Sequence, residues 1–422
     1  MQDAAERRDE TKHGADRSRG VGAEPAVDDL WRFISLDDYH LPRLPVRGAL
    51  QKNWAALKQA FRRQPDQTSP FKPEEELRAL DEIRLARLLA SPDRGRAARA
   101  LDTGLKDWLD RETGEAGVRF IVGQPYSGLD DIVRHWAAAR DAPVMPSPDE
   151  AQIRGADAGW LDHFGAGDNP WVLPNLERCF RRHVQGLDLV RRFFEAAESG
   201  RLGRGLIACD SWAWAYLQHV WPSIRVDALT LQAFDGADLQ RLLIHLTVSG
   251  GNRTVCYRNA KSGDAIFTVP TEAAAASGEL VQLACHCRGN VGLALEHWRS
   301  RLRTEPEVDG SSSEAREEME EKREAGERVV WVASGMGDPT LPAQKDDCLM
   351  LLLHALLIHG GLPEALLPEL LPFSRARCMG ALLALRGAGA VQWDRGRWRV
   401  RALAYAAVRE GLRGRDYLVD QF

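Results

Sequence analysis

The sequence predicts an α/β protein: a parallel sheet covered by helices on both faces, followed by a smaller domain at the C-terminal end. Short apolar runs alternate with helical segments through the middle of the chain, which is typical of parallel sheets buried on both sides. Towards the C-terminal end this alternation gives way to three helices and two short strands. With 422 residues, 44% hydrophobic and 28% charged, the chain is long enough for two or three domains with their own cores.

The N-terminal part contains a tail and a helical region. Residues 1–28 are polar with dense mixed charge, so we expect this tail to be disordered. A helical region is expected over residues 29–94, because Trp54 and Phe61 fall on one helix face and residues 75–90 form an amphipathic pattern.

The α/β core is expected over residues 95–248. Its strands are predicted from apolar runs at residues 118–123, 171–173, 205–209 and 227–234, with a short extended run at 142–145. Helices are predicted between the strands, at residues 129–139, 176–198, 211–220 and 238–247.

Three further segments follow the core. Residues 249–303 are expected to form a hairpin and then two helices, and residues 304–328 a charged linker that contains a solvated helix. The last domain, residues 329–422, contains three predicted helices, a tight turn at Asp394-Arg-Gly396 between two short strands, and a final helix. Three helices followed by a β-hairpin is the order of a winged-helix domain.

Composition excludes several classes of protein. A net charge of −5 and a pI near 6.2 exclude a protein that binds along nucleic acids through an overall positive charge. Seven cysteines without framework spacing, together with the absence of a signal-peptide pattern, predict a reduced, cytoplasmic protein. The longest apolar run, residues 348–358, is about half the ~20 residues that a membrane-spanning helix needs, so no transmembrane segment is expected.

One glycine motif, Gly123-Gln-Pro-Tyr-Ser-Gly128, lies between a predicted strand and a predicted helix. Its G-x-x-x-x-G spacing is that of a phosphate-binding loop, in which backbone amides and a helix N-terminus hold an anion. Leu129 and Asp130 stand where such a loop needs Lys and Ser or Thr, so a plain strand–helix turn is the other interpretation. The candidate phosphate-binding residues are Gly123, Gln124, Pro125, Tyr126, Ser127, Gly128 and Leu129.

Further candidates lie at the expected ligand edge of the sheet. Glu177 follows the second core strand and could polarise a water or be a solvated helix acid; Asn175 stands near the position of a Mg²⁺-binding Asp. Asp210 follows the next strand and could sense a phosphate or cap the helix behind it. Arg288 precedes a later helix and could reach a nucleotide or stay at the surface.

Taken in order, these segments resemble a P-loop NTPase of the AAA/STAND type followed by a winged helix, over roughly residues 95 to 422. The resemblance implies a five-stranded parallel core with helices on both faces, a helical lid within residues 249–303, and switching driven by bound ATP or ADP. It is carried by FIVGQPYSG (Walker A-like), WVLPNLERCF (Walker B-like), LIACDSWAWAYL (sensor 1-like) and CRGNVGLALEHW (sensor 2-like).

The loop lacks its Lys and its Ser or Thr, and the second strand lacks the Mg²⁺-binding Asp. These absences argue against hydrolysis and against a well-formed Mg²⁺ site. Loss of one group that stabilises the transition state can cost about 10²–10³ in rate, and here several are replaced. The first hypothesis is therefore a degenerate member of the family, either responsive to nucleotide or purely a scaffold, with little or no hydrolysis. The second is an active ATPase that uses Glu177 and Asp210 as catalytic residues, and the third is a DNA-binding regulator.

The predicted winged helix is locally basic although the whole chain is acidic. Arg375 and Arg377 begin the helix that would read DNA, and Arg395 and Arg397 lie on the wing. Small and apolar residues follow Arg377, which favours a protein partner, bound through the winged helix or the N-terminal helices, over DNA. No metal site is expected, because Cys285-His286-Cys287 has no second ligand pair. Oligomerisation is left open.

Overall fold

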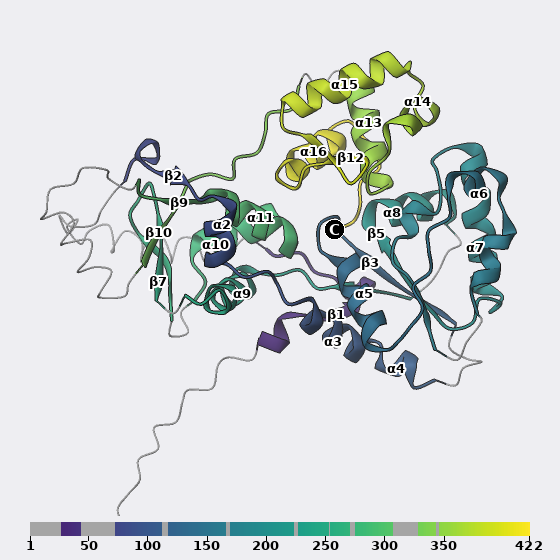
Figure 1. Ribbon diagram of the computed structural model, residues 1–422, viewed down its shortest axis with the longest axis horizontal. Helices are drawn as coiled ribbons and strands as arrows, with labels where there is room; N and C mark the ends of the chain where they lie inside the picture. The colour runs from purple at the N-terminus through teal and green to yellow at the C-terminus, as the bar shows by residue number, and fades with distance from the viewer. Residues whose placement is uncertain are drawn as a thin grey trace, which may run out of the picture.

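The computed structural model describes residues 27–43, 72–111, 117–165, 169–222, 227–252, 254–270, 275–306, 328–342 and 346–422. Within these residues the chain forms two five-stranded sheets and a separate two-stranded hairpin. Figure 1 shows the first sheet on the right, the second on the left, and the C-terminal helices above them.

The first sheet has the order β1-β6-β3-β5-β4. Its strands β6, β3, β5 and β4 run parallel, whereas β1 is antiparallel to β6. The all-parallel sheet expected from the sequence is thus wrong at one edge, because a strand from the N-terminal region supplies the fifth member. Residues 142–145 contribute only one bridge, between Val144 and Val172. The strands are β1 (Phe33–Ser35), β3 (Val118–Gly123), β4 (Trp171–Leu173), β5 (Gly205–Asp210) and β6 (Ala228–Leu231).

Helices cover both faces of the first sheet. Alternate side chains of a strand point to opposite faces, so Phe120 and Val122 join one hydrophobic cluster while Ile121 joins the other. One cluster includes apolar residues of α3 and α5, and the other includes those of α7 and α8. The helices are α3 (Arg94–Gly104), α5 (Leu129–Ala139), α7 (Asp188–Glu198) and α8 (Ser211–Val220), with the shorter α4 (Lys106–Leu109) and α6 (Glu150–Gly155).

The second sheet was not predicted. Its order is β2-β9-β10-β7-β8. The predicted hairpin is present as the antiparallel pair β7–β8, but β10 then returns parallel to β7 from beyond the charged segment. This sheet consists of β2 (Arg78–Ala79), β7 (Val255–Asn259), β8 (Ala265–Val269), β9 (Leu302–Thr304) and β10 (Arg328–Val332). The helices beside it are α2 (Glu82–Leu88), α9 (Gly236–Ser249), α10 (Gly278–His286) and α11 (Val291–Arg301).

The N-terminal region differs from the expected helices. The amphipathic stretch predicted at residues 75–90 contains β2 and the short α2 instead of one long helix. The predicted helix face around Trp54 and Phe61 lies outside the described residues, as do the tail up to residue 26 and linker residues 307–327. The short 3-10 helices are η1 (Val27–Leu30), η2 (Leu36–Asp38), η3 (Glu74–Glu76), η4 (Ala158–His163), η5 (Leu176–Arg178), η6 (Val184–Gly186), η7 (Glu364–Leu366) and η8 (Ala402–Ala404).

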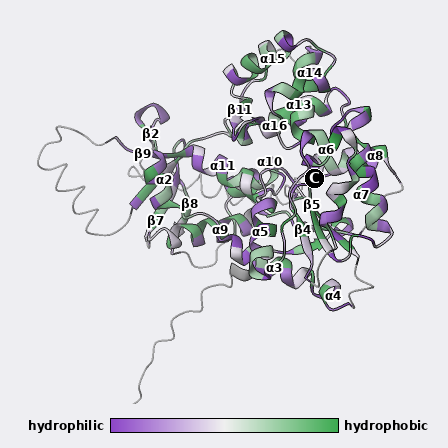
Figure 2. Cartoon of the chain, turned by 45° about the vertical axis from the view of Figure 1, so that its right-hand side comes forward, coloured by the Kyte–Doolittle hydropathy of each residue, from purple (hydrophilic) through white to green (hydrophobic). Residues whose placement is uncertain are grey.

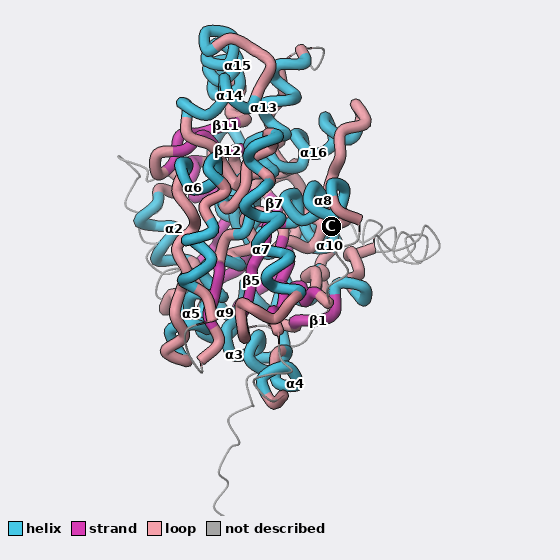
Figure 3. Tube along the Cα trace, turned by 90° about the vertical axis from the view of Figure 1, so that its right-hand side faces the viewer, coloured by secondary structure: helices cyan, strands magenta, loops and turns pink. Residues whose placement is uncertain are grey.

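Residues 346–422, hereafter the C-terminal unit, contain three helices, a hairpin and a fourth helix in chain order. Its central helix, α13, is buried around most of its circumference, and Figure 2 colours it largely hydrophobic. Figure 3 shows α13, α14 and α15 together at one end of the molecule, with α3 and α4 at the other. The elements are α13 (Asp347–Ile358), α14 (Leu367–Leu370), α15 (Arg375–Gly387), β11 (Val391–Asp394), β12 (Arg397–Val400) and α16 (Tyr405–Arg413).

The chain then leaves α16 and returns to the first sheet. Phe422 is buried, and its ring lies 4.7 Å from the ring of Tyr39. This return places the C-terminal unit over the carboxyl ends of β3 and β5, where the candidate site lies. No helix among the described residues combines the length and the apolar character that crossing a lipid bilayer requires.

Candidate functional site between the sheet edge and the C-terminal unit

The Gly123–Gly128 loop lies at the carboxyl edge of the first sheet. β3 pairs with β5 in a register that places Gly123 opposite Asp210, and β4 lies on the other side of β5. The loop therefore shares one edge with the ends of the strands that precede Pro174 and Asp210, as the sequence predicts. This is the edge at which open parallel sheets bind ligands.

The loop backbone is tightly curled. Gly128 has a φ of 80°, and Tyr126 has a φ of 68°, a left-handed conformation that non-glycine residues rarely adopt. A β-carbon on Gly123 would lie 2.8 Å from Leu129 Cδ2. Leu129 thus packs back against the start of the loop, at the position where a phosphate-binding loop carries its lysine.

Two other parts of the chain hold the loop in this shape. Asn290, at the start of α11, donates from Nδ2 to the carbonyl of Pro125 at 2.7 Å. A β-carbon on Gly292 would lie 1.8 Å from the carbonyl oxygen of Tyr126, so only glycine permits this approach of α11 to the loop. On the opposite side, the Tyr126 hydroxyl donates to the carbonyl of Val400 in β12.

A cation lies against the loop, but it comes from α3. The Arg94 guanidinium packs on Gly128, where a β-carbon would be 2.5 Å from Arg94 Cζ. Its Nη1 is buried without a hydrogen-bond partner, and its Nε lies 3.9 Å from Asp131 Oδ2. Burial lowers the pKa of Arg94. Sequence reasoning missed this residue, because Arg94 precedes β3 and nothing in its local pattern points to the loop.

The two carboxylates proposed from the sequence are neighbours. The Asp210 amide donates to Glu177 Oε2 at 3.3 Å, and the Asp210 side chain accepts from the Trp212 amide at 2.9 Å. Asp210 therefore caps α8, one of the two roles expected for it. Burial raises the pKa of Glu177, and burial together with Glu177 raises that of Asp210. Both side chains consequently hold protons more readily than free carboxylic acids.

Asn175 stands at the end of β4, near the position where the family resemblance places a metal-binding Asp. Its Nδ2 donates to Asp130 Oδ1 at 3.1 Å, and Arg134 also binds this oxygen. Asp130 is thereby engaged by protein donors, and it offers no hydroxyl group at the start of α5. These residues do not fit the Mg²⁺ site of a P-loop NTPase.

The hairpin β11–β12 covers the other side of the site. Arg399 donates from Nε to the carbonyl of Gly360 at 3.1 Å and lies 3.3 Å from Asp394. Arg397 donates to the carbonyl of Gly361 at 3.3 Å and forms no ion pair among the described residues. Burial, with the nearby charges of Arg178 and Arg181, lowers the pKa of Arg397 to about 10.

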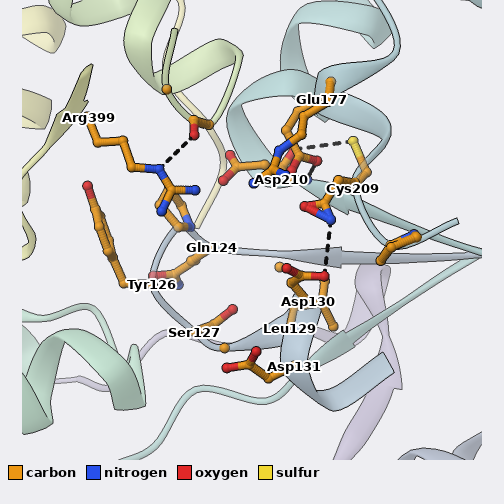
Figure 4. A pocket seen from close by; sticks show the side chains of 18 of the residues that line it. Gln124, Tyr126, Ser127, Leu129, Asp130, Asp131, Glu177, Cys209, Asp210 and Arg399 are labelled. Atoms are coloured by element: carbon orange, nitrogen blue, oxygen red, sulfur yellow. Dashed lines mark hydrogen bonds between the residues drawn. The ribbon is translucent and has the colours of Figure 1, made fainter. Parts of the chain in front are cut away.

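These groups enclose a cavity of about 650 Å³, within the size range of small-molecule sites. Figure 4 shows Glu177, Asp210 and Arg399 along one side of it and Ser127, Leu129 and Asp131 along the other. Of the residues selected from the sequence, those that line the cavity are Gly123, Gln124, Pro125, Tyr126, Ser127, Gly128, Leu129, Glu177, Asp210, Arg395 and Arg397.

Arg288 is outside this lining. Its Nε donates to the Phe422 carbonyl at 2.5 Å, and its own carbonyl faces the Gln124 amide group at 3.5 Å. The Arg288 side chain is thus bound to the returning end of the chain and not to the cavity. The expectation that Arg288 supplies a cation to the ligand is not supported by this placement.

Arg375 and Arg377 also lie away from the cavity. Both are exposed on α15, where Arg375 pairs with Glu364 at 3.1 Å and Arg377 pairs with Asp346 at 3.3 Å. The wing residue Arg397 instead points into the cavity. The basic residues predicted for one DNA-binding surface are therefore divided between a solvent-exposed helix and an internal site.

No family model matches the chain, and no curated protein matches it in sequence. Among solved structures, it is similar to a Walker-type ATPase of Pyrococcus abyssi, with 11% identity, coverage of 75% of this chain and 95% of that chain, and a TM-score of 0.25. It is also similar to the ORC2 protein of Aeropyrum pernix, solved in ADPNP-ADP complexes, with 11% identity, coverage of 90% and 97%, and a TM-score of 0.23. Scores this low support no conclusion about the ligand or activity of this chain.

Proposed function

We propose that the protein is a regulator that binds a nucleotide, ATP or ADP, in the cavity between a P-loop NTPase-like core and a C-terminal winged-helix domain, without hydrolysing it. The bound phosphates would hold the winged helix against the sheet edge. The nucleotide would thus control how tightly the hairpin β11–β12 is held at the sheet edge, while the exposed helix α15 stays available to a protein partner.

The observation that carries this proposal is a set of cavity-lining guanidinium groups, two of which have buried nitrogens without hydrogen-bond partners. Arg94, Arg178 and Arg397 all line the cavity, and each comes from a different part of the chain. Arg94 Nη1 and Arg178 Nε are buried without hydrogen-bond partners. Buried charged donors without partners are costly, and a phosphate group would satisfy them with charge-assisted hydrogen bonds.

The two buried carboxyl groups of the cavity, Glu177 and Asp210, do not prevent anion binding. The raised pKa values of Glu177 and Asp210 mean that burial favours their neutral forms. A neutral carboxyl group can donate a hydrogen bond to phosphate, whereas an ionised one repels it. An anion in the cavity would raise these pKa values further.

Several replacements support binding without turnover. Leu129 cannot supply the charge of a lysine, and Asp130 and Asn175 do not form the expected Mg²⁺ site. With these stabilising groups absent, the phosphoryl group that would be transferred lacks the electrostatic support that catalysis requires.

The direct test is calorimetric titration of the full chain with ATP, ADP and GTP, each with and without Mg²⁺. We expect saturable binding that does not require Mg²⁺. Arg94→Ala should weaken it by roughly tenfold or more, because hydrogen bonds to charged groups contribute about 1.5–3 kcal/mol. Arg375→Ala, which removes an exposed arginine outside the cavity, is the matched control.

Each other outcome would support a different function for this protein. Absence of binding to all three nucleotides would leave a purely scaffolding role. Steady turnover that Glu177→Gln abolishes would support the active-ATPase hypothesis. The orientation of Arg397 into the cavity weighs against the DNA-binding hypothesis, which a salt-dependent shift of duplex DNA, lost in Arg375→Ala, would revive.

A further inference from the structure

Outside the cavity lining, three potential metal ligands converge beside the second sheet. His286 ends α10, His297 lies within α11, and Asp338 belongs to the loop after β10. One ligand atom from each residue lies within 4.8 Å of the other two. We propose that His286, His297 and Asp338 bind a divalent transition-metal ion of the Zn²⁺ type.

His297 is held in the orientation of a metal ligand. The residue is 1% exposed, and its Nδ1 lies 3.1 Å from the carbonyl oxygen of Met336. Because a carbonyl only accepts hydrogen bonds, Nδ1 carries the proton and Nε2 keeps its lone pair. Histidine ligands in proteins commonly donate their second ring nitrogen to a carbonyl in this way.

His286 and Asp338 complete the group. His286 Nε2 lies 3.1 Å from Asp338 Oδ1, and the His286 and His297 rings meet edge to face with centroids 4.9 Å apart. Two imidazole nitrogens bound to Zn²⁺ at about 2.0–2.1 Å would lie roughly 3.3 Å apart in a tetrahedral site. The most widely separated ligand atoms must therefore close by up to about 1.5 Å.

The loop that carries Asp338 can make part of this adjustment. Asp338 is exposed, and the loop contains Gly335 and Gly337, both with positive φ values of 77° and 68°. Glycine allows backbone changes there with little steric cost. His297 stays fixed in the interior, so the metal would draw the loop onto α10 and α11.

The donor set selects the class of metal. Imidazole nitrogens suit Zn²⁺, Co²⁺ and Ni²⁺, whereas Mg²⁺ and Ca²⁺ prefer oxygen ligands. Three protein ligands leave a coordination position for water. The nearby Arg301 does not preclude a cation, because its guanidinium is already paired with Glu279 and donates to the Ala333 carbonyl.

The neighbouring cysteines do not belong to the site. Cys287 is buried, and burial raises the pKa of its thiol. Cys285 Sγ faces the carbonyl of Pro42 at 3.8 Å. A cysteine-based metal site at residues 285–287 is thus not formed, and the histidine between the cysteines pairs instead with ligands distant in sequence. Such pairing leaves no spacing motif that sequence reasoning could detect.

The test uses the untagged full chain, stripped of metal with a chelator and titrated with Zn²⁺ by calorimetry and with Co²⁺ by visible absorption. We expect one equivalent of metal per chain and Co²⁺ d–d bands characteristic of nitrogen and oxygen ligands. His286→Ala and Asp338→Ala should each weaken Zn²⁺ binding by more than about tenfold, since even loss of an outer-shell partner costs 10–100-fold. His163→Ala, at an exposed histidine in the α/β core, is the matched control and should leave binding unchanged.

The two variants lie on the less buried ligands, so that circular dichroism can verify the fold before binding is compared. Excess Mg²⁺ should leave the Co²⁺ spectrum unchanged. The proposal fails if the wild-type chain binds neither Zn²⁺ nor Co²⁺ stoichiometrically. It also fails if both variants retain wild-type affinity, which would leave His286 and Asp338 as a simple ion pair.

Discussion

The C-terminal unit contacts the first sheet through two regions that differ in how their charges are satisfied. One is the Asp420 network, formed by Asp420, Arg409, Ser211, Tyr405 and Trp212. There Arg409 Nε donates to Asp420 Oδ1 at 3.1 Å, Ser211 donates to Oδ2 at 2.5 Å, and Trp212 Nε1 donates to the Tyr405 hydroxyl at 2.9 Å. The other is the cavity, where guanidinium groups of Arg94 and Arg178 retain buried unpartnered nitrogens.

This difference indicates a division of roles. A buried ion pair with all its hydrogen bonds made is costly to break, so the Asp420 network holds the C-terminal unit in place without a ligand. Unpartnered buried cations have the opposite property, because their environment improves when an anion arrives. Under the proposed function, the same interface would thus contain a permanent attachment and a region that responds to a ligand.

The largest expected effect comes from breaking the permanent attachment. Asp420→Ala should lower the free energy of unfolding by about 3–5 kcal/mol, because it leaves the Arg409 guanidinium buried and unpaired. Denaturant unfolding measures the change. Asp394→Ala is the matched control. Asp394 pairs with Arg399 but is more exposed than Asp420, so its loss should cost about 1 kcal/mol or less. An equal decrease in the free energy of unfolding in both variants would contradict the idea that the Asp420 network is the stronger attachment.

The sequence predicts an element well when the signal is local, and poorly when the element depends on residues that are far away in the sequence. The buried runs of β3, β4 and β5 were predicted almost residue for residue, because continuous apolar stretches bounded by turn signals are distinctive. β1 and β9 have only three residues each, and their pairing partners lie far along the chain. No local pattern announces such strands.

The candidate site shows the same limit. The loop residues and Asp210 were found because a glycine motif and a strand end are local signals. Arg94 and Asp420 were missed, because each acts on an element far from it in the sequence. Trp212 and Tyr405 likewise form their hydrogen bond across 193 positions.

A second prediction uses pH to test another contact of the C-terminal unit with the core, made by His354. His354 Nδ1 lies 2.9 Å from Arg182 Nη1, and its Nε2 lies 2.9 Å from the Leu418 carbonyl, so the neutral ring joins the core to the returning chain. Burial and Arg182 lower the pKa of His354 to about 4. The unfolded chain, with a histidine pKa near 6.5, binds the proton first as the pH falls, so stability is lost between about pH 6.5 and 4.

The size of this effect follows from the shift. Each pKa unit corresponds to about 1.4 kcal/mol, so His354 contributes a loss of about 3 kcal/mol across that range. Urea unfolding at a series of pH values, compared between the wild type and His354→Gln, isolates the contribution. Identical pH dependence in the two proteins would show that His354 is protonated without cost.

The third prediction concerns the region that responds to ligand. Without nucleotide, Arg397→Ala should be neutral or slightly stabilising, because the Arg397 charge lies near those of Arg178 and Arg181. At a nucleotide concentration 100 times its dissociation constant, the wild type should gain about 2.7 kcal/mol of stability, and the variant should gain clearly less. Thermal unfolding with and without nucleotide measures both. A destabilised ligand-free variant would assign Arg397 to the permanent attachment.

The smallest effect is expected at Glu177 in the cavity, whose pH dependence should have the opposite sign to that of His354. At low pH, where Glu177 is protonated, Glu177→Gln should change stability little. Gln retains an oxygen that accepts the 3.3 Å hydrogen bond from the Asp210 amide, and such bonds contribute about 1 kcal/mol. Burial raises the pKa of Glu177 above its unfolded value of about 4.3, so the folded chain holds this proton longer as the pH rises. Stability contributed by the protonated form is therefore lost as the pH increases through the folded pKa, opposite to the effect of His354.

Urea unfolding at a series of pH values measures this difference. The free energy of unfolding of Glu177→Gln should rise relative to that of the wild type as the pH increases. A difference that stays constant with pH would mean that Glu177 ionises in the cavity as freely as in water.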